Sequence, residues 1–443
     1  MRRTGNLYDA IADPENLQLA FWRARRGKDG KPEVEEFRRH LDRHLDALRR
    51  DLLNEAVEPG PFHRFTIHDP KDRLICAAPF RDRVLHHAIM NVCEPAFERY
   101  QVSDSYACRR GKGLHAALQR AVQFTRRHTW YLKLDVRKYF DRIAHDVLRR
   151  NLARRFKDAR LLRLFTTLID GYAASPGRGI PIGNLTSQYF ANDYLAGVDH
   201  RVKEILYIPG YVRYMDDVVL WHDDRDALLR AERDLRAHCQ DVLGLELKPL
   251  CLNRTAKGVT MLGYRVFPGY VALARRSRTR FAGKLRGYWN KLQKGEWNQN
   301  DFAVHVLPLS AYVGHARSTG FRRAVMVQIG CSPQARTALT AAAVGTTTPP
   351  TAERPTVTAI RRRTRTTTSG SASRSRPQLK EVDGCPPLNR VASRPRVGPG
   401  QRGSAAAELV GAEDSATDGP AAVLPELGLR RSDDGSRWTN TGC

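Results

Sequence analysis

Two adjacent aspartates, Asp216 and Asp217, lie inside the apolar segment 211–221, which reads Tyr-Val-Arg-Tyr-Met-Asp-Asp-Val-Val-Leu-Trp. The β-favouring residues on both sides predict two strands, with the acids at the tight connection between them. Burying neighbouring carboxylates beside an apolar sheet is costly unless cations neutralise them, and hard oxygen ligands suit Mg²⁺. The segment therefore predicts a metal site. Two other Asp-Asp pairs in the chain lack this strand context.

A second acid follows another predicted strand, in the segment 130–140. Leu132 and Leu134 alternate there with Lys133 and Asp135, which is typical of a half-buried strand. If this strand pairs beside the hairpin, Asp135 meets Asp216 at one metal site. Two metal ions about 3.5–4 Å apart could then activate a 3′-hydroxyl and stabilise a pyrophosphate leaving group. The spacing therefore points to the chemistry of a nucleotide polymerase.

Apolar residues at helical spacing predict the elements that surround these strands. The predicted helices cover 41–52, 141–170, 186–206 and 228–242, the last one stopped by Gly244. The apolar stripe at 41–52 is interpreted as a packing surface rather than a partner surface. Strands and helices in this order predict an α+β fold, in which an antiparallel sheet is covered on one face by helices.

The charge balance indicates a nucleic-acid partner. Lysine and arginine number 74 against 47 acidic residues, which gives a net charge of +27 and a pI near 10.2. Residues 331–443 contain 16 basic and 10 acidic side chains, so most of the excess lies in 1–330. A basic groove gains affinity for nucleic acid through counterion release. A role at membranes is disfavoured, since no apolar run approaches the roughly 20 residues that span a bilayer.

The eight cysteines are scattered without a Cys-x-x-Cys pair, and no apolar signal region follows the charged start. Both features predict a reducing cytoplasm with unpaired thiols. His86, His87 and His145 have no Cys/His ligand spacing around them, so they are interpreted as structural or phosphate-facing residues rather than metal ligands.

Further short motifs extend the polymerase pattern along the chain. They occur in a fixed order around the two acidic segments: Arg73-Leu74-Ile75, Pro79 to Arg83, Asp104-Ser105-Tyr106 with Arg110 to Gly113, Asp135 to Phe140, Gly179 to Gln188, Leu243 to Lys248, and Leu262-Gly263-Tyr264. Together with Tyr-Met-Asp-Asp, this series resembles the reverse transcriptases over about residues 64 to 325. The resemblance implies a right-hand polymerase fold with fingers, palm and helical thumb. The expected organisation is an N-terminal helical region at 1–60, fingers and palm at 61–262, a thumb at 263–330, and a tail at 331–443.

The resemblance also implies roles for individual residues. Asp135, Asp216 and Asp217 would be catalytic, and with the backbone carbonyl of Val136 they would hold two Mg²⁺ ions, with Mn²⁺ as an alternative. The residues implied to contact the nucleotide are Arg73, Phe140, Ile182, Gln188 and Lys248. Those implied to contact the template–primer duplex are Arg275, Arg276, Arg278, Arg280 and Lys284.

Three of these roles have a plain structural alternative. Phe140, five residues after Asp135, stands where the family places an aromatic that blocks a ribose 2′-hydroxyl, but it could be a core phenylalanine. Arg73 suits a triphosphate because a guanidinium matches phosphate oxygens, yet a solvated surface arginine remains the alternative. Lys248 is either a general acid for pyrophosphate or a lysine at a strand edge.

One motif narrows the resemblance. Most relatives carry Gln-Gly-x-x-x-Ser-Pro where this chain has Ile182 to Gln188, and this exchange resembles the reverse transcriptases of diversity-generating retroelements. His86-His87, Gly111 to Ala117 and Ser310 to His315 resemble the same subfamily. Such enzymes copy a template RNA into cDNA with errors at adenines, and they commonly work with a small basic accessory variability protein. The resemblance further implies bacterial or phage origin.

Two other interpretations stay open. The same chemistry could serve a retron-like or phage-defence enzyme, which neighbouring repeats that differ only at adenines would distinguish. An inactive RNA-binding scaffold could instead have kept the fold, although retention of the three aspartates and Phe140 disfavours it.

The last part of the chain, 331–443, differs in composition. It holds 11 of the 24 prolines, and Trp438 is its only aromatic residue. Its runs of Thr, Ser, Ala and Arg predict a disordered tail. The basic cluster 360–366 is interpreted as part of a solvated tail rather than as an RNA tether.

Overall fold

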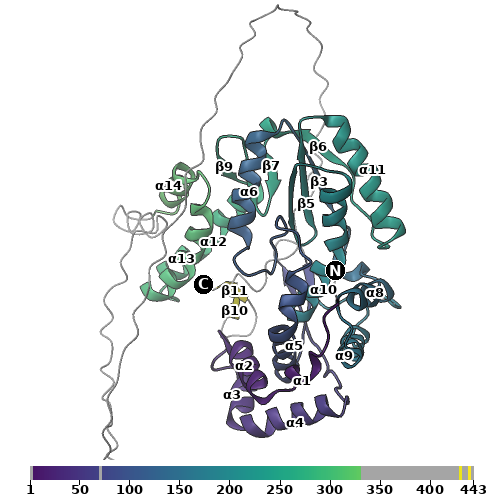
Figure 1. Cartoon of the computed structure of the whole chain (residues 1–443). Helices are drawn as coiled ribbons and strands as arrows, with labels where there is room; N and C mark the ends of the chain where they lie inside the picture. The colour runs from purple at the N-terminus through teal and green to yellow at the C-terminus, as the bar shows by residue number, and fades with distance from the viewer. Residues whose placement is uncertain (1–2, 69–71, 331–428, 432–437, 441–443) are drawn as a thin grey trace, which may run out of the picture. The chain divides into compact units, whose positions relative to one another are not determined.

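The computed structural model describes residues 3–68, 72–330, 429–431 and 438–440. These residues belong to one compact unit, while a second unit, Thr348–Thr417, lies outside the described residues. Figure 1 shows the described helices and strands along the chain.

The centre of the described fold is a four-stranded sheet in the order β4-β5-β3-β6, antiparallel throughout. Its strands are β3 (Trp130–Asp135), β4 (Gly210–Tyr214), β5 (Asp217–His222) and β6 (Cys251–Arg254). All five residues of β4 and five of the six in β5 are buried, which explains their nearly continuous apolar sequence. The prediction of two strands flanking the acid pair, with a third strand beside them, is confirmed.

The register assigns side chains to the two faces of this sheet. Residues directly opposite on antiparallel strands share a face, so Asp135 and its partner Asp217 lie on the same side. Helix α6 (Leu114–Arg127) contacts that side, where Trp221 donates a hydrogen bond to Thr125. The other side packs on α10 (Leu185–His200) and α11 (Arg225–Asp241). In Figure 1 the sheet stands between α6 and α11.

The predicted helix 141–170 is broken into three. The pieces are α7 (Tyr139–Arg142), α8 (His145–Arg155) and α9 (Ala159–Asp170). Ile143 and Ala144 adopt extended ψ angles of 117° and 127°, and Asp158 caps the start of α9 by accepting a hydrogen bond from Leu161. A side chain that caps a helix start competes with helix continuation, so the single long helix was wrong. The predicted helix 186–206 corresponds to α10 followed by one π-helical turn, Arg201–Ile205.

Helices from the N-terminal region pack against α5 (Phe80–Glu98), which also contacts α10. They are α1 (Tyr8–Ile11), α2 (Pro14–Arg25), α3 (Pro32–Arg39) and α4 (Leu41–Leu53). The stripe predicted as a packing surface in 41–52 is confirmed as such, because Leu48 and Leu52 of α4 are fully buried. Between α4 and α5 in the sequence, β1 (His63–His68) and β2 (Asp72–Ala77) form an antiparallel hairpin.

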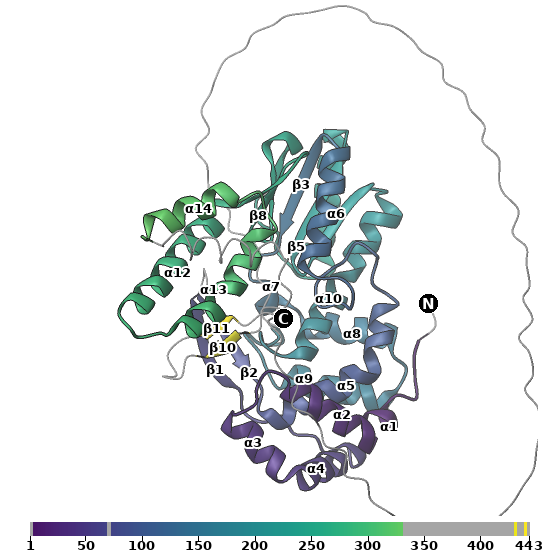
Figure 2. The same cartoon turned by 90° about the vertical axis from the view of Figure 1, so that its left-hand side faces the viewer.

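The region after the central sheet combines a small sheet with three helices. The sheet contains β7 (Val259–Met261), β8 (Tyr264–Val266) and β9 (Val271–Leu273), preceded by a 3-10 turn at Thr255–Lys257. The helices are α12 (Arg275–Gln293), α13 (Gln299–Gly314) and α14 (Thr319–Gln328), grouped beside β8 in Figure 2. The small sheet spans the domain boundary expected at 262/263. Tyr264 of β8 donates to the carbonyl of Tyr312 in α13, which ties sheet to helices.

Most of the predicted tail, 331–443, lies outside the described residues. Within it, β10 (Leu429–Arg431) pairs antiparallel with β11 (Trp438–Asn440). In the described part of the chain, no helix combines the length and apolar character that crossing a bilayer requires.

Candidate active site at the β4–β5 turn

The two central acids lie at a two-residue hairpin turn. Strand β4 ends at Tyr214 and β5 begins at Asp217, so Met215 and Asp216 make the turn. Met215 has φ of 56°, in the left-handed region that costs a non-glycine residue roughly 1–2 kcal/mol. The turn is therefore held in a strained conformation by its surroundings.

Asp135 joins the pair because it ends β3 directly opposite Asp217. Asp216 is 4% exposed and Asp217 1% exposed. Burial, and next the Asp135 carboxylate, raise the pKa of Asp216 to about 7. Burial also raises the pKa of Asp217, an effect that Lys133 opposes. The structure thus brings together the three acids that the sequence singled out, and their mutual repulsion shows in the raised pKa values.

Two lysines supply the positive charge at this site. Lys248 Nζ donates to Asp135 Oδ2 at 2.7 Å, and its backbone N–H donates to the Asp135 carbonyl at 2.9 Å. Lys133 Nζ lies 3.3 Å from Asp217 Oδ1. Lys248 therefore contacts the carboxylate cluster itself. Lys133 is not among the site residues predicted from the sequence, although its alternation with Leu132 and Leu134 puts it on the face of Asp135.

The carboxylates suit a divalent cation because several of their oxygens lack a well-formed hydrogen bond from the residues that the structure describes. Asp216 Oδ1 and both oxygens of Asp217 are buried without a well-formed hydrogen bond from the described residues. Buried oxygens of this kind are costly unless a cation neutralises them. Within the described part of the chain, no three His, Cys, Asp or Glu side chains already stand as a ready-made metal group. The oxygens of Asp135, Asp216 and Asp217 are nevertheless the hard donors that Mg²⁺ prefers.

Two residues expected near the metal and the nucleotide lie just after β3. Val136 is buried and forms an antiparallel bridge with Leu247, next to Lys248. Phe140 is 7% exposed, in the short helix α7, and its carbonyl accepts a hydrogen bond from the backbone of Ile180. Phe140 is therefore packed like a core residue while its backbone contacts the loop that leads to Ile182.

Ile182 sits in a turn that docks onto β2. Its carbonyl accepts the Cys76 N–H at 2.9 Å, and its side chain is partly buried against the core. Gly183 follows with φ of 114°, and an added Cβ would stand 2.9 Å from Ile75, so the turn requires glycine. Asn184 completes the docking, because its side chain accepts from the backbone of Ala78 and donates to the carbonyl of Cys76.

The remaining expected contacts lie on separate elements. Arg73 lies on β2, half-buried and opposite Ile67. Gln188 lies in α10, where its Oε1 accepts a weak hydrogen bond from Cys108 Sγ at 3.3 Å. The five basic residues expected to grip a duplex all lie on α12: Arg275, Arg276 and Arg278 are exposed, and Arg280 and Lys284 are half-buried. Their contact with nucleic acid stays a prediction.

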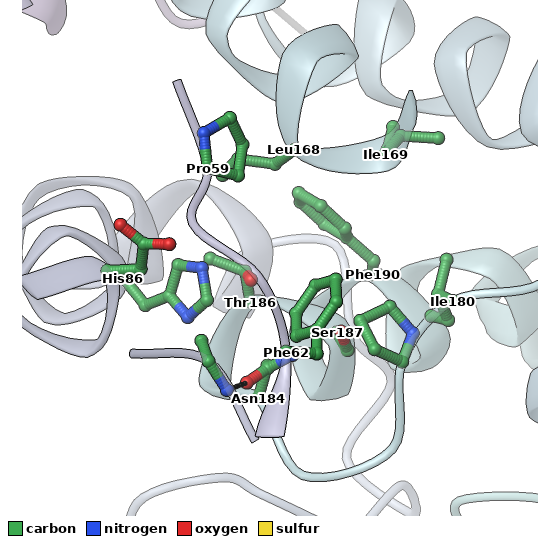
Figure 3. A pocket seen from close by; sticks show the side chains of 13 residues that line it. Pro59, Phe62, His86, Leu168, Ile169, Ile180, Asn184, Thr186, Ser187 and Phe190 are labelled. Atoms are coloured by element: carbon green, nitrogen blue, oxygen red, sulfur yellow. Dashed lines mark hydrogen bonds between the residues drawn. The ribbon is translucent and has the colours of Figure 1, made fainter. Parts of the chain in front are cut away.

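A small cavity lies elsewhere, lined in part by residues at the start of α10 (Figure 3). It measures about 20 Å³ and is lined by residues that include Asp82, His86, Asn184 and Ser187. A cavity of this size holds about one water molecule. Burial, with the neighbouring His87, lowers the pKa of His86 to about 3, so this histidine is neutral and structural.

Comparison with known proteins agrees with the site. Residues 68–266 match the family model described as reverse transcriptase (RNA-dependent DNA polymerase). The chain is similar to Protein YkfC of Escherichia coli (strain K12), at 26% identity over 280 residues that cover 53% of this chain and 72% of that protein. It is also similar to the putative COX1/OXI3 intron 1 protein of Saccharomyces cerevisiae, at 23% identity over 47% of this chain and 27% of that protein.

Telomerases are among the solved structures with which the chain aligns. Telomerase from Candida tropicalis aligns at a TM-score of 0.40 and 11% identity, covering 64% of this chain and 59% of that one. Telomerase from Candida albicans, solved with a fragment of telomeric RNA, aligns at a TM-score of 0.38 and 11% identity, covering 65% and 61%. The chain thus spans about three fifths of these proteins and about a quarter of the yeast intron protein. From its motifs, its carboxylate site and the family match, the segment 68–266 is a reverse transcriptase domain, of the RNA-directed DNA polymerase class.

Proposed function

We propose that this protein extends a DNA primer on a template RNA, by attack of the primer 3′-hydroxyl on an incoming deoxynucleoside triphosphate. The observation that carries the proposal is the cluster of Asp135, Asp216 and Asp217, in which Asp216 Oδ1 and both oxygens of Asp217 are buried without a well-formed hydrogen bond from the described residues. An RNA-binding scaffold would have no use for this arrangement, which destabilises the fold.

The residues that would hold divalent ions are the three aspartates and the backbone carbonyl of Val136. When bound, a pair of Mg²⁺ ions, or Mn²⁺ in their place, would supply electrostatic stabilisation of the attacking and leaving oxygens. Lys248 and Lys133 balance the carboxylate charge and keep Asp135 and Asp217 in position. Lys248 lies beside the site as a candidate proton donor to the leaving pyrophosphate.

Other residues would position the substrates. Arg73 would contact the triphosphate, Gln188 would contact the incoming nucleotide, and Phe140 would exclude a ribose 2′-hydroxyl. The basic face of α12 (Arg275, Arg276, Arg278, Arg280 and Lys284) would bind the template–primer backbone, with affinity that falls steeply as salt rises.

The decisive experiment is Mg²⁺-dependent extension of a DNA primer on RNA. Wild-type protein should extend the primer, whereas Asp216→Asn should lose at least about 10³-fold in rate because it removes a charge from the reacting centre. The matched control is Asp223→Asn, since Asp223 also belongs to an Asp-Asp pair but is exposed and accepts hydrogen bonds from Thr129. Equal activity of Asp216→Asn and wild type would refute the proposal, and so would RNA binding without extension by the wild type.

We further propose that the enzyme is error-prone at template adenines and serves a diversity-generating retroelement, together with a small basic accessory protein. Ile182 supports this, because it can pack but cannot hydrogen-bond where the wider family has a glutamine. One missing hydrogen bond is worth roughly 0.5–1.5 kcal/mol, or up to about a tenfold change in nucleotide preference.

Sequencing of the extension products tests this finer proposal. Ile182→Gln should lower errors at adenines, and Ile180→Val is a control in the same loop, since Ile180 is buried away from solvent. An unchanged error spectrum in Ile182→Gln would remove the explanation. Neighbouring template and variable repeats that differ only at adenines would support the retroelement, whereas their absence would favour a retron-like or phage-defence role.

A further inference from the structure

Arg213 is a charged residue in the middle of an apolar strand. It lies on β4, two residues before Met215, and is 0% exposed. Its cross-strand partner is Val218, so its side chain lies on the face of the sheet opposite to Asp135 and Asp217. Arg213 is therefore buried behind the catalytic turn rather than in the substrate cleft.

Asp199 of α10 neutralises this arginine with a two-pronged ion pair. Arg213 Nε donates to Asp199 Oδ1 at 2.6 Å, and a terminal nitrogen donates to Asp199 Oδ2, also at 2.6 Å. Asp199 is itself 0% exposed and accepts a further hydrogen bond from the Tyr211 hydroxyl. A planar guanidinium matched to a carboxylate in this way has one orientation. The ion pair therefore fixes where the other guanidinium donors point.

Those donors reach three separate parts of the fold. One nitrogen donates to Asn192 Oδ1 at 3.0 Å and to the carbonyl of Met215 at 3.2 Å. The other reaches Gln101 Oε1 at 3.1 Å. The backbone of Arg213 also exchanges hydrogen bonds with the segment around Asp104, which covers the edge of β4. The guanidinium thus joins α10 and the 101–107 segment to the turn.

The contact with the Met215 carbonyl has a direct consequence for Asp216. This carbonyl belongs to the peptide group that enters Asp216, so its orientation sets the direction of the Asp216 side chain. Met215 has positive φ, a conformation that persists only when neighbouring groups impose it. The hydrogen bond from Arg213 is such a restraint, applied from behind the sheet.

We propose that Arg213, oriented by Asp199, is the positioning residue of the catalytic turn: it clamps the Met215 carbonyl and so directs the Asp216 carboxylate toward Asp135. The inference rests on the proposed polymerase function for its kinetic consequence. A lysine cannot replace the arginine, because one ammonium group cannot hold the Asp199 carboxylate and the Met215 carbonyl in the fixed fork geometry.

A double substitution separates positioning from simple stability. Arg213→Met with Asp199→Leu removes the buried pair without leaving an unpaired charge, which often preserves or improves stability. The matched control is Arg155→Met with Asp193→Leu, because Arg155 Nε of α8 and Asp193 Oδ1 of α10 form another buried ion pair, at 3.0 Å, which makes no hydrogen bond to the turn within the described part of the chain. Thermal melting of both proteins confirms folding before kinetics are measured.

The expected result is a loss of about 10²-fold in kcat for primer extension by the Arg213/Asp199 variant, with the KM for deoxynucleotide little changed. The control variant should keep the wild-type kcat. Mn²⁺ binding to the protein alone, measured by electron paramagnetic resonance, should weaken in the first variant and not in the second. Wild-type kcat and wild-type Mn²⁺ binding in the folded Arg213/Asp199 variant would overturn the proposal.

Arg213→Lys is the alternative test if the double variant does not fold. It keeps the charge and should show the same loss of kcat, while Arg155→Lys should not; equal kcat values for these two lysine variants would overturn the proposal. If wild-type protein extends no primer at all, the polymerase function fails, and the Mn²⁺ comparison still decides whether Arg213 positions the aspartates.

Discussion

The aspartates of the β4–β5 turn and Asp199 of α10 are buried in the same part of the fold, yet their surroundings differ. Asp199 receives two guanidinium hydrogen bonds and one from a tyrosine hydroxyl. Asp216 Oδ1 and both oxygens of Asp217 receive no comparable hydrogen bond from the described residues. Arg213 neutralises Asp199 fully within the protein, whereas Lys133, 3.3 Å from Asp217, leaves buried oxygens of Asp216 and Asp217 that a metal cation could neutralise.

This difference distinguishes acids that hold the fold together from acids that we propose to bind the metal. A saturated ion pair such as Arg213–Asp199 can orient a backbone group because its geometry has one solution. An unsaturated carboxylate costs stability but keeps its oxygens available for a ligand. The two kinds of acid are linked here, because Arg213 of the saturated pair also donates to the carbonyl of Met215, which precedes the unsaturated Asp216.

The largest expected effect comes from neutralising the unsatisfied acid. Asp216→Asn should abolish primer extension yet raise the stability of metal-free protein at pH 8 by roughly 1–3 kcal/mol, because a buried charge disappears. The pKa of Asp216 is about 7 in the folded protein, above its unfolded value near 4. The folded state therefore binds this proton more tightly, and the stability gain should fade as pH falls through 7. Thermal melts with a chelator at pH 8 and pH 5 would check this, and a lower melting temperature at pH 8 would contradict it.

Breaking the buried ion pair between Arg155 and Asp193 should have the opposite pattern. Asp193→Ala leaves Arg155 buried without its carboxylate and should destabilise the protein by about 3–5 kcal/mol. Its kcat at a temperature where the variant is folded should stay near the wild-type value. Urea unfolding and primer extension measure the two effects separately. A large loss of kcat with little loss of stability would erase the distinction between the two kinds of acid.

The lysine beside the site should show an intermediate effect. Lys248 holds Asp135 Oδ2, so Lys248→Met removes a cation that competes for this oxygen. Mn²⁺ binding to the protein alone should tighten by up to about tenfold, equivalent to roughly 1.4 kcal/mol. Loss of a general acid should at the same time lower kcat. Weaker Mn²⁺ binding would show that Lys248 supports the metal-binding geometry instead of competing with metal.

The smallest expected effect on stability concerns a carboxylate that accepts hydrogen bonds from backbone N–H groups. Asp158 accepts the N–H groups of Leu7, Tyr8 and Leu161. Burial raises its pKa, but these hydrogen bonds outweigh burial and lower the pKa below its usual value. The contribution of Asp158 to the stability of the fold is thus present above pH 4, and it is lost as pH falls through the lowered pKa. Asp158→Asn should cost about 1 kcal/mol at pH 7 and less at pH 3.

A surface acid, Asp146, provides the control for the stability change expected of Asp158→Asn. Asp146→Asn removes an exposed carboxylate that pairs with Arg150 within one helix, and it should change stability by under about 0.5 kcal/mol. If Asp158→Asn and Asp146→Asn lose the same stability at pH 7, the backbone hydrogen bonds of Asp158 stabilise the fold no more than a surface ion pair does.

Several elements could be predicted from local pattern alone. The alternation in 130–135 and the β-rich residues around Asp216 predicted β3, β4 and β5, because strand patterning depends on neighbours in the chain. The long helix predicted over 141–170 failed at Ile143 and Asp158, where extended backbone and a side-chain cap interrupt a pattern that still looks helical. Apolar periodicity does not reveal such caps, since the same periodicity continues on both sides.

The sequence by itself determined which residues we propose to carry the chemistry, through three aspartates, their strand contexts and the order of the surrounding motifs. Tertiary structure alone decided that Asp135 pairs with Asp217, that Lys133 and Lys248 lie against these carboxylates, and that Arg213 donates to the carbonyl of Met215 from behind the sheet. The reason is physical: sequence patterns depend on neighbours along the chain, whereas strand register joins distant residues such as Trp130 and Arg254, and ion pairs join others such as Asp135 and Lys248. Arg213 did leave one signal, as a lone charge in a strand that is otherwise apolar.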